Sequence, residues 1–316
     1  MRHTKLFVPK QFIDCINGYK EYLRLKGLRD SSIDSHCYSL IPALQKFDAD
    51  GIKNLRYINP ATIYRIYERT SDKHSLASPL RSFLRYLFKA GEVSGEFSEF
   101  VPTPRRKQLV PSVYTKDEMS LFLDSFNRNS ATGKRNFAIA LLALRLGMRV
   151  SDIMMLKVSD IDYDKKKIFF IQSKTNVKQF LELVDEVGDA LRDYLDNARP
   201  ASSHENVFLT SMFAIKPLAY STIYNNVREH LLKSGVKPNA RKCGLHSLRM
   251  TFASELVAEK VPYDAVRKIL GHETPTATKH YVGFDVESLR TCAIPVPPLS
   301  GIFERVMKGK VEGVPL

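Results

Sequence analysis

The sequence predicts a mainly α-helical chain with a small β-sheet or hairpin, arranged as two domains. Apolar residues recur at helical spacing through most of its 316 residues, as expected of helices with one buried face. One stretch, "KKIFFIQSKTNVKQFLELV", instead contains two β-rich runs separated by polar residues. Residues 93–114 lose this periodicity and hold three prolines, so they predict a linker between the two domains.

The first domain, residues 1–92, is predicted to be a bundle of short helices. Its first helix should end at Gly27, and a second over 31–46 should break or kink at Pro42. The segment "NPATIYRIYERT" predicts a third helix with Asn59 as its N-cap.

The last helix of this domain carries a basic stripe. "SPLRSFLRYLFKAG" predicts a helix with Ser78 as its N-cap and Pro79 at its first position. Arg81, Arg85 and Lys89 then follow at four-residue spacing and share one face. The stripe is either a face that contacts a polyanion or an ordinary solvated one.

The linker contains a second basic run, Arg105, Arg106 and Lys107. Between two basic domains, such a run indicates a hinge that also touches phosphate groups. A solvated connector is the alternative.

The second domain is predicted over residues 115–285 and opens with a capping box from Thr115 to Glu118. The apolar helix "NFAIALLALRLG" ends at Gly147, and "MRVSDIMMLKV" predicts another helix directly after it. The hairpin follows. Four more helices are predicted around residues 187–198, 221–234, 246–259 and 262–270.

Charge favours a polyanionic partner. Lys and Arg number 48 against 34 acidic residues, a net charge of +14, and the first 110 residues hold 19 basic and 11 acidic residues. Because cationic surfaces release counterions from a polyphosphate, nucleic acid ranks ahead of a membrane surface. No apolar run approaches the roughly 18 residues of a membrane span, so the protein is expected in the cytoplasm. The cysteines form no C-x-x-C pair, so no metal site is predicted.

One short motif suits phosphate chemistry. In "GLHSLRMTFASEL", His246 and Arg249 are three residues apart at the start of a helix, so they share a face at an end that favours anions. A capping or salt-bridge role is the alternative.

Arg149 and Lys174 are further candidates. Arg149 lies in apolar sequence and needs a partner, either the nearby Asp152 or a phosphate. Lys174 is at the hairpin tip, and spacing alone does not select it over its neighbours. Those neighbours are Lys165, Lys166, Lys167 and Lys178.

Four segments together form a specific pattern: "LRLGMRVSDI", "QSKTNVKQFLELV", "HSLRMTFAS" and "LGHETPTATKHY". In this order and spacing they closely resemble the tyrosine recombinases, the phage integrase family. "LRSFLRYLFKAGEV" is similar to the last helix of the family's core-binding domain, and "VPSVYTKDEMSLFL" to the entry of its catalytic domain. The resemblance places the catalytic positions at Arg149, Lys174, His246, Arg249, His272 and Tyr281.

The resemblance implies a DNA strand transferase that needs no metal, ATP or other cofactor. Tyr281 would attack a phosphodiester and form a 3′-phosphotyrosyl link, leaving a free 5′-hydroxyl. His246 would accept the proton of the tyrosine, and Lys174 would protonate the leaving 5′ oxygen.

The other three positions would bind the phosphate. Arg149 and Arg249 would hold its non-bridging oxygens, because planar guanidinium groups match them well. His272 would hydrogen-bond the same phosphate.

The resemblance also implies an architecture and partners. A helical, SAM-like core-binding domain and a mixed α/β catalytic domain would form a C-shaped clamp around double-stranded DNA with an inverted-repeat core site. Four copies would act through a Holliday junction, with the tail 286–316 contacting a neighbouring protomer. No arm-binding domain is expected before residue 11, so the chain is similar to the simple Xer-type enzymes. Chromosome dimer resolution, mobile-element integration and excision, inversion, and an accessory recombination protein all stay open.

Two features depart from the family's pattern. Met250 stands where many relatives have histidine. The second hairpin strand ends "LVDEV", without the proline common in relatives, which leaves its register and the choice between Lys174 and Lys178 open.

Alternative functions make other demands on the sequence. A metal-dependent nuclease needs clustered carboxylates, and the candidates here are Asp160, Asp162 and Asp164. Because Lys165 and Ile171 replace the glycine and glutamate of a calcium loop, these aspartates predict a polar turn before the hairpin. A non-catalytic DNA-binding protein would tolerate loss of any of the six positions, and none is lost. A type IB topoisomerase or a telomere resolvase would share the tyrosine nucleophile.

Overall fold

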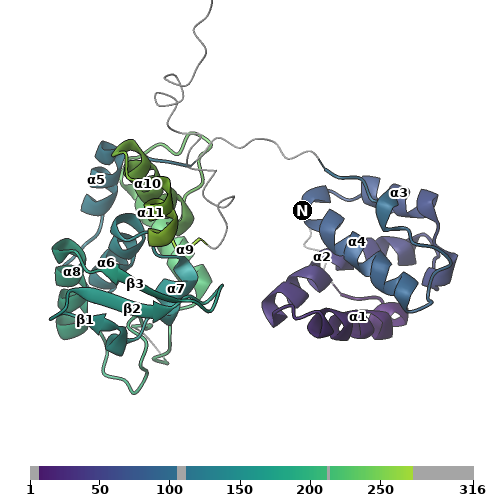
Figure 1. The fold of residues 1–316 in the computed structure, drawn as a ribbon, viewed down its shortest axis with the longest axis horizontal. Coiled ribbons are helices and arrows are strands. Elements are labelled where there is room, and N and C mark those ends of the chain that lie inside the picture. Colours follow the sequence, from purple (N-terminus) through teal and green to yellow (C-terminus); the bar gives the residue numbers. More distant parts are fainter. Residues whose placement is uncertain (1–6, 105–111, 212–213, 273–316) are drawn as a thin grey trace, which may run out of the picture. The chain divides into compact units, whose positions relative to one another are not determined.

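Two separate hydrophobic cores divide the chain into two units, Met1–Leu109 and Val110–Leu316. The computed structural model describes residues 7–104, 112–211 and 214–272 (Figure 1). The structure is mainly helical with a small sheet, as the sequence predicts. No helix among these residues is long and apolar enough to cross a membrane.

The described part of the first unit contains four α-helices around one core. Tyr19, Phe47 and Phe83 are buried at its centre. Short 3₁₀ turns lie at Lys10–Phe12, Leu55–Tyr57 and Ser98–Phe100. The helices are α1 Ile13–Leu25, α2 Asp30–Ala49, α3 Pro60–Glu68 and α4 Lys73–Lys89.

Helix α2 runs unbroken through Pro42, so the predicted break is absent. A proline inside a helix costs about 3 kcal/mol because it removes a hydrogen bond and clashes with the preceding turn. Leu44 and Phe47 follow Pro42 and are each 1% exposed. Burying two such side chains returns roughly 3–6 kcal/mol, enough to carry the helix past the proline.

Helix α4 begins six residues before the predicted Pro79, at Lys73. The N-cap is Asp72, whose carboxylate accepts a hydrogen bond from the Ser75 N–H at 3.0 Å. Leu76 is buried in the added turn, so the apolar face extends before the proline. The predicted N-cap at Ser78 is therefore wrong, while the Asn59 cap of α3 is confirmed at 2.9 Å to the Thr62 N–H.

Residues near both ends of the predicted linker pack into the two cores. Val93 and Val101 are buried in the core of the first unit, and Tyr114 is buried in the core of the second. The sequence hides these attachments because each is a single apolar residue in a segment without periodicity.

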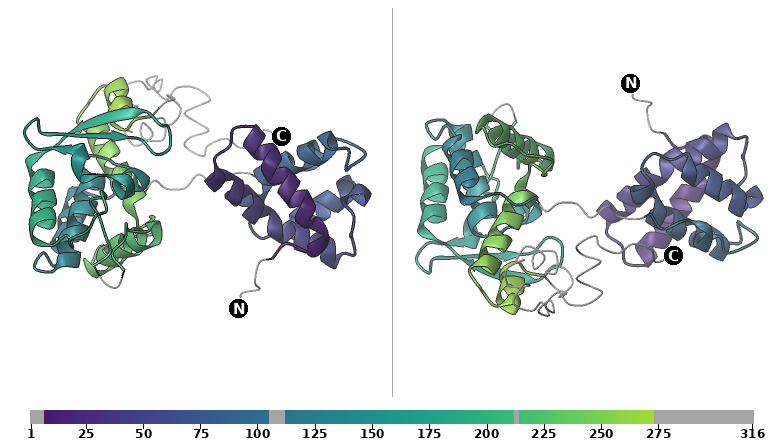
Figure 2. Two further views of the ribbon diagram at one scale, coloured as in Figure 1. Left: turned by 90° about the horizontal axis from the view of Figure 1, so that it is seen from below. Right: turned by 90° about the horizontal axis from the view of Figure 1, so that it is seen from above.

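The second unit places a three-stranded antiparallel sheet beside a set of helices. The strands are β1 Ile161–Asp162, β2 Lys167–Ile171 and β3 Lys178–Glu182, in the order β1-β2-β3. In both views of Figure 2 they lie along one side of the unit. The predicted hairpin is confirmed, with Phe169 opposite Phe180, and β1 is an addition because two residues carry too short a pattern to predict.

Helix α6 is the central helix of this unit and packs against α8 and α10. Its segment from Ala138 to Leu144 is completely buried. The predicted capping box of α5 is confirmed, with both Thr115 and Glu118 engaged. The helices are α5 Lys116–Asp124, α6 Ala131–Arg145, α7 Val150–Met155, α8 Asp185–Asn197, α9 Tyr220–Lys233, α10 Leu245–Ala258 and α11 Tyr263–Ile269.

Candidate active site

Arg149 is placed by the sharp turn between α6 and α7. Gly147 adopts φ +62°, and a Cβ there would lie 2.6 Å from the ring of Phe252, so the turn requires glycine. Arg149 is the N-cap residue of α7, and its Nη2 donates to the Gly271 carbonyl at 2.9 Å. Its Nη1 lies 3.9 Å from a carboxylate oxygen of Asp152 and makes no hydrogen bond to the described residues. A buried guanidinium N–H group in this state can donate to an added anion.

Arg249 lies on the first turns of α10 and is 4% exposed. Its Nη1 donates to the Gly147 carbonyl and its Nη2 to the Leu270 carbonyl at 2.7 Å. The same Nη2 lies 3.1 Å from Nε2 of His272. Arg249 thus joins the turn before Arg149 to the end of α11.

His246 precedes Arg249 by one helical turn and is exposed to solvent. Although the residue as a whole is exposed, its ring is partly desolvated by neighbouring atoms, which lowers its pKa, and the charges of Arg249, Lys242 and Arg149 lower it further. The imidazole is therefore neutral at pH 7 and available as a proton acceptor.

His272 lies just after α11, where its backbone N–H donates to the Arg267 carbonyl at 3.0 Å. Burial lowers its pKa to about 4, and the charges of Arg249, Arg149, Lys174 and Arg267 add to that effect. Because the guanidinium of Arg249 can only donate, Nε2 of His272 must accept. The neutral ring then carries its proton on Nδ1 and can donate a hydrogen bond from that atom.

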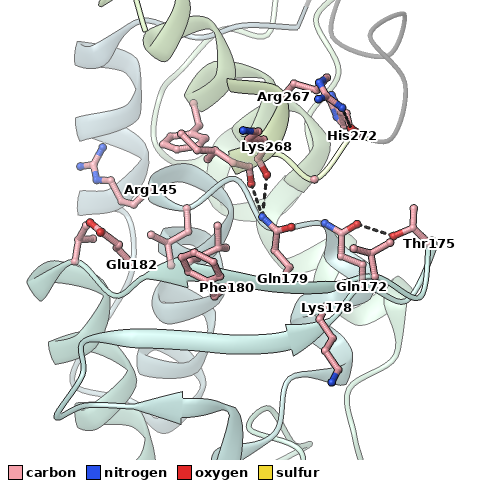
Figure 3. A pocket seen from close by; sticks show the side chains of 17 residues that line it. Arg145, Gln172, Thr175, Lys178, Gln179, Phe180, Glu182, Arg267, Lys268 and His272 are labelled. Atoms are coloured by element: carbon pink, nitrogen blue, oxygen red, sulfur yellow. Dashed lines mark hydrogen bonds between the residues drawn. The ribbon is translucent and has the colours of Figure 1, made fainter. Parts of the chain in front are cut away.

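The loop between β2 and β3 is held against this cluster from two sides. Asp152 is 3% exposed, and one oxygen of its carboxylate accepts from the Ser173 N–H at 2.9 Å and from the Ser173 hydroxyl at 2.7 Å. Gln172 packs so closely on Gly271 that a Cβ there would lie 1.7 Å from its amide nitrogen. Thr175 donates to that amide oxygen at 2.7 Å (Figure 3).

Lys174 is the exposed residue that follows Ser173 in this anchored loop. Its charge contributes to the lowered pKa of His272, and that of Lys178 is not among the causes. Lys178 pairs with Ile171 at the end of the ladder, and Figure 3 shows its side chain extending away from His272. The geometry therefore favours Lys174 over Lys178 as the lysine of this site.

A cavity of about 720 Å³ lies between β3 and α11 (Figure 3). It shares Gly271 and His272 with the cluster, whereas Arg149, His246 and Arg249 do not line it. The side-chain amide of Gln179, in β3, joins the two elements that line the cavity by donating to the Lys268 carbonyl of α11 at 2.9 Å. The cavity thus borders the cluster of basic residues at His272 and does not include its two arginines or His246.

Five of the six candidate catalytic positions lie in the described structure, and Tyr281 lies outside it. Ser173, Gln172 and Gly271 also belong to this site, although the sequence does not predict them there. Only Gly271 carries a sequence signal, a glycine at a helix end, because the other two act through contacts made by the fold.

The predicted DNA-contacting residues differ in whether their side chains are already engaged within the protein. Arg81 donates to the Val101 carbonyl at 2.9 Å and to Thr103, and Arg85 donates to Ser98 at 3.2 Å. Both arginines therefore fasten the segment after α4 onto that helix. Lys89 is exposed at the helix end, while Arg105, Arg106 and Lys107 lie outside the described residues.

The aspartates before the hairpin form the predicted polar turn. Asp160 accepts from the Lys157 N–H at 2.9 Å, and Asp162 accepts from the Lys165 N–H at 2.8 Å. Within the described ranges, no group of three or more His, Cys, Asp or Glu residues is arranged to hold a metal ion.

Comparison with known proteins identifies the family. The model of the phage integrase family matches residues 112–287. A Sinorhizobium fredii protein named as an integrase/recombinase, y4rA, is 31% identical over 225 residues, covering 70% of this chain and 54% of that protein. The tyrosine recombinase XerD of Staphylococcus saprophyticus is 23% identical over 87% of this chain and 95% of its own length. The chain thus spans about half the length of y4rA and nearly all of XerD.

A solved structure shares the fold. The site-specific recombinase XerH, bound to its difH substrate before cleavage, matches with a TM-score of 0.64 and 16% identity. The match covers 92% of this chain and 90% of XerH. With a family model that matches more than half of its residues, this chain belongs to the phage integrase family of tyrosine recombinases.

Proposed function

We propose that this protein is a site-specific DNA recombinase that cuts and rejoins DNA through a covalent 3′-phosphotyrosyl intermediate. The main support is the convergence of Arg149 and Arg249 on the Leu270–His272 turn, with Nη1 of Arg149 lacking a hydrogen-bond partner among the described residues. Two guanidinium groups beside a neutral histidine form a site for one phosphate with growing negative charge.

In the proposed cleavage step, the Tyr281 hydroxyl attacks the scissile phosphorus. A new Tyr281 oxygen–phosphorus bond forms while the phosphorus–5′ oxygen bond breaks. His246 takes the phenol proton, and the Lys174 ammonium gives a proton to the leaving oxygen. A phenol with an ordinary pKa of about 10 is protonated at neutral pH, so it needs an acceptor of this kind.

In the rejoining step the proton transfers run backwards. The 5′-hydroxyl of an exchanged strand attacks the phosphotyrosine and releases Tyr281. One phosphoester replaces another, so the proposed chemistry requires neither ATP nor a metal ion. Arg149 and Arg249 stabilise the same five-coordinate phosphorus in both directions.

The proposed partner is double-stranded DNA with an inverted-repeat core site. Four protomers would bind this DNA and exchange its strands through a Holliday junction. The net charge of +14 supports a polyanionic partner. Lys89 and the run Arg105–Lys107 are the proposed phosphate contacts outside the site, since Arg81 and Arg85 already donate within the first unit. An accessory recombination protein is compatible with this proposal.

A strand-exchange assay tests the proposed function. Duplexes bound by the protein are selected from fragments that flank its gene, and paired labelled fragments are then incubated with the protein in EDTA. Exchanged products support the proposal. Relaxation of supercoiled DNA without exchange would indicate a type IB topoisomerase. Closed hairpin ends would indicate a telomere resolvase. Binding without any product would indicate a non-catalytic DNA-binding protein.

A further inference from the structure

The guanidinium of Arg241 is saturated with hydrogen bonds. Its Nε donates to the Pro238 carbonyl at 2.9 Å, and its two terminal nitrogens donate to both Glu118 oxygens at 2.8 and 2.6 Å. The remaining two N–H groups donate to the Val113 carbonyl at 3.0 Å and the Lys237 carbonyl at 2.7 Å. All five donors of an arginine are therefore used. We call this arrangement the Arg241 clamp.

The clamp closes a strained loop. Asn239 and Ala240, just before Arg241, have φ of +48° and +67°, a left-handed conformation that costs about 1–2 kcal/mol for a residue with a Cβ. Such strain persists when the surroundings hold the backbone in place. Arg241, which follows the two strained residues, does this by donating to the Lys237 and Pro238 carbonyls, which precede them. Its guanidinium also lies 4.1 Å from the ring centre of Tyr114.

The loop leads directly into the helix that carries His246. The Lys242 carbonyl accepts from the Ser247 hydroxyl at 2.6 Å and from the Tyr114 hydroxyl at 3.0 Å. The Lys242 N–H donates to the Ser112 hydroxyl at 2.7 Å. Ser247 follows His246 in α10, so the backbone at the start of this helix is fixed from two directions.

The same contacts hold the entry of the second unit. Ser112, Val113 and Tyr114 are its first described residues, and each bonds to the loop or to α10. The Tyr114 N–H donates to the Thr251 hydroxyl at 3.1 Å, two residues beyond Arg249. The chain that arrives from the first unit is thereby attached to the helix that bears both catalytic candidates.

We infer that Arg241 is a positioning residue that fixes the start of α10 and so sets the placement of His246 relative to the phosphate site. This inference rests on the proposed function for its catalytic meaning. Arg241 does not touch the phosphate in this account, because none of its donors is left to bind one. A misplacement of about 1 Å at a reacting group costs on the order of 100-fold in rate, so a modest shift of α10 is measurable.

The chain offers a matched control in Arg199. It also donates to three backbone carbonyls, those of Val207 at 3.1 Å, His204 at 2.6 Å and Asn206 at 2.9 Å, in a loop that does not lead into α10. Arg199→Lys and Arg241→Lys therefore remove similar backbone contacts. A purely structural role predicts similar effects from the two substitutions.

The test compares both variants with the wild-type protein in two measurements. The first is the first-order rate of cleavage of pre-bound nicked duplex, with the DNA Kd measured alongside. The second is an NMR titration of His246 in the DNA-free protein. For Arg241→Lys we expect a rate lower by roughly 10- to 100-fold at unchanged Kd, and a His246 pKa that moves back up as the helix start loosens. Arg199→Lys should leave both unchanged.

Equal effects of the two substitutions, or no effect of Arg241→Lys on either measurement, would overturn the inference. If Arg241→Lys does not fold, Glu118→Gln provides the same test, because it removes the charge opposite Arg241 and keeps one acceptor oxygen. If the wild-type protein cleaves no DNA, the proposed function fails, and the His246 titration still decides whether Arg241 positions this helix.

Discussion

Arg149 and Gly271 are joined by a 2.9 Å hydrogen bond although 122 residues separate them in the sequence. This bond uses Nη2 of the guanidinium and leaves Nη1 buried without a hydrogen bond to the described residues. The structure therefore holds Arg149 in place and keeps one of its nitrogens available, as a preorganised anion site requires.

Arg149→Lys should preserve the positive charge but lose the planar pair of N–H donors that can point at two acceptors at once. A lysine cannot bind the Gly271 carbonyl and a phosphate oxygen in a fixed geometry at once, so we expect cleavage to slow by roughly 10²- to 10³-fold. Cleavage of a nicked duplex under single-turnover conditions measures this. Arg145→Lys, at the exposed ion pair with Glu186, is the control and should cleave normally. A rate for Arg149→Lys within threefold of wild type would refute the role.

The lysine of the hairpin loop can be identified through the leaving group. Lys174→Ala should slow cleavage of ordinary DNA by roughly 10²- to 10⁴-fold, the usual contribution of a general acid. A substrate with sulfur in place of the bridging 5′ oxygen leaves as a thiolate and needs no acid, so the variant should cleave it at nearly the wild-type rate. Lys178→Ala is the matched control and should resemble wild type on both substrates. If Lys178→Ala is instead the variant that cleaves ordinary DNA slowly and the sulfur substrate at the wild-type rate, the choice of Lys174 is wrong.

The histidine after α11 makes stability depend on pH. Burial holds the pKa of His272 at about 4, below the ordinary value of about 6.5 expected in the unfolded chain. Between these values the unfolded state binds more protons, so the free energy of unfolding should fall as the pH drops from 6.5 towards 4. Urea titrations at pH 7.5 and 5.0 measure the loss, and His272→Asn should reduce it. An equal loss in the variant would show that other groups carry this dependence.

The proposed tetramer predicts a role for the tail in assembly. Deleting residues 299–316 should leave binding to a single DNA site largely intact and lower recombination, because this segment is proposed to contact a neighbouring protomer. Gel-shift and strand-exchange assays on the same preparation separate the two effects. Unchanged recombination would contradict the proposed contact.

Elements with strong local signals could be predicted from the sequence. The capping box at Thr115, the N-cap Asn59 and the two β runs each depend on neighbouring residues, and the structure has all of them. Pro42 and Pro79 misled the prediction because burial of distant apolar partners outweighs their local cost. Local pattern alone contains no information about those partners.

In the site, too, features that depend on neighbouring residues could be predicted from the sequence, and features that depend on distant contacts could not. The spacing of His246 and Arg249 on one helical turn follows from sequence, whereas the choice of Lys174 depends on strand register and on the attachment of Ser173 to Asp152. The lowered pKa of His272 depends first on its burial and then on cations from separate segments, both of which the fold creates. Arg241 reaches Glu118 across 123 residues, and the residues next to Arg241 in the sequence carry no signal of that contact.

The most direct test of the proposed chemistry is a search for the covalent intermediate. Nicked duplexes drawn from DNA around the gene are incubated in EDTA with the wild-type protein and with Tyr281→Phe, and the products are examined on denaturing gels and by peptide mass spectrometry. We expect a DNA adduct on the peptide that contains Tyr281, joined through a 3′-phosphate and absent from the variant. An adduct that persists in Tyr281→Phe, or the absence of any adduct on a duplex that the protein demonstrably binds, would contradict the proposed chemistry.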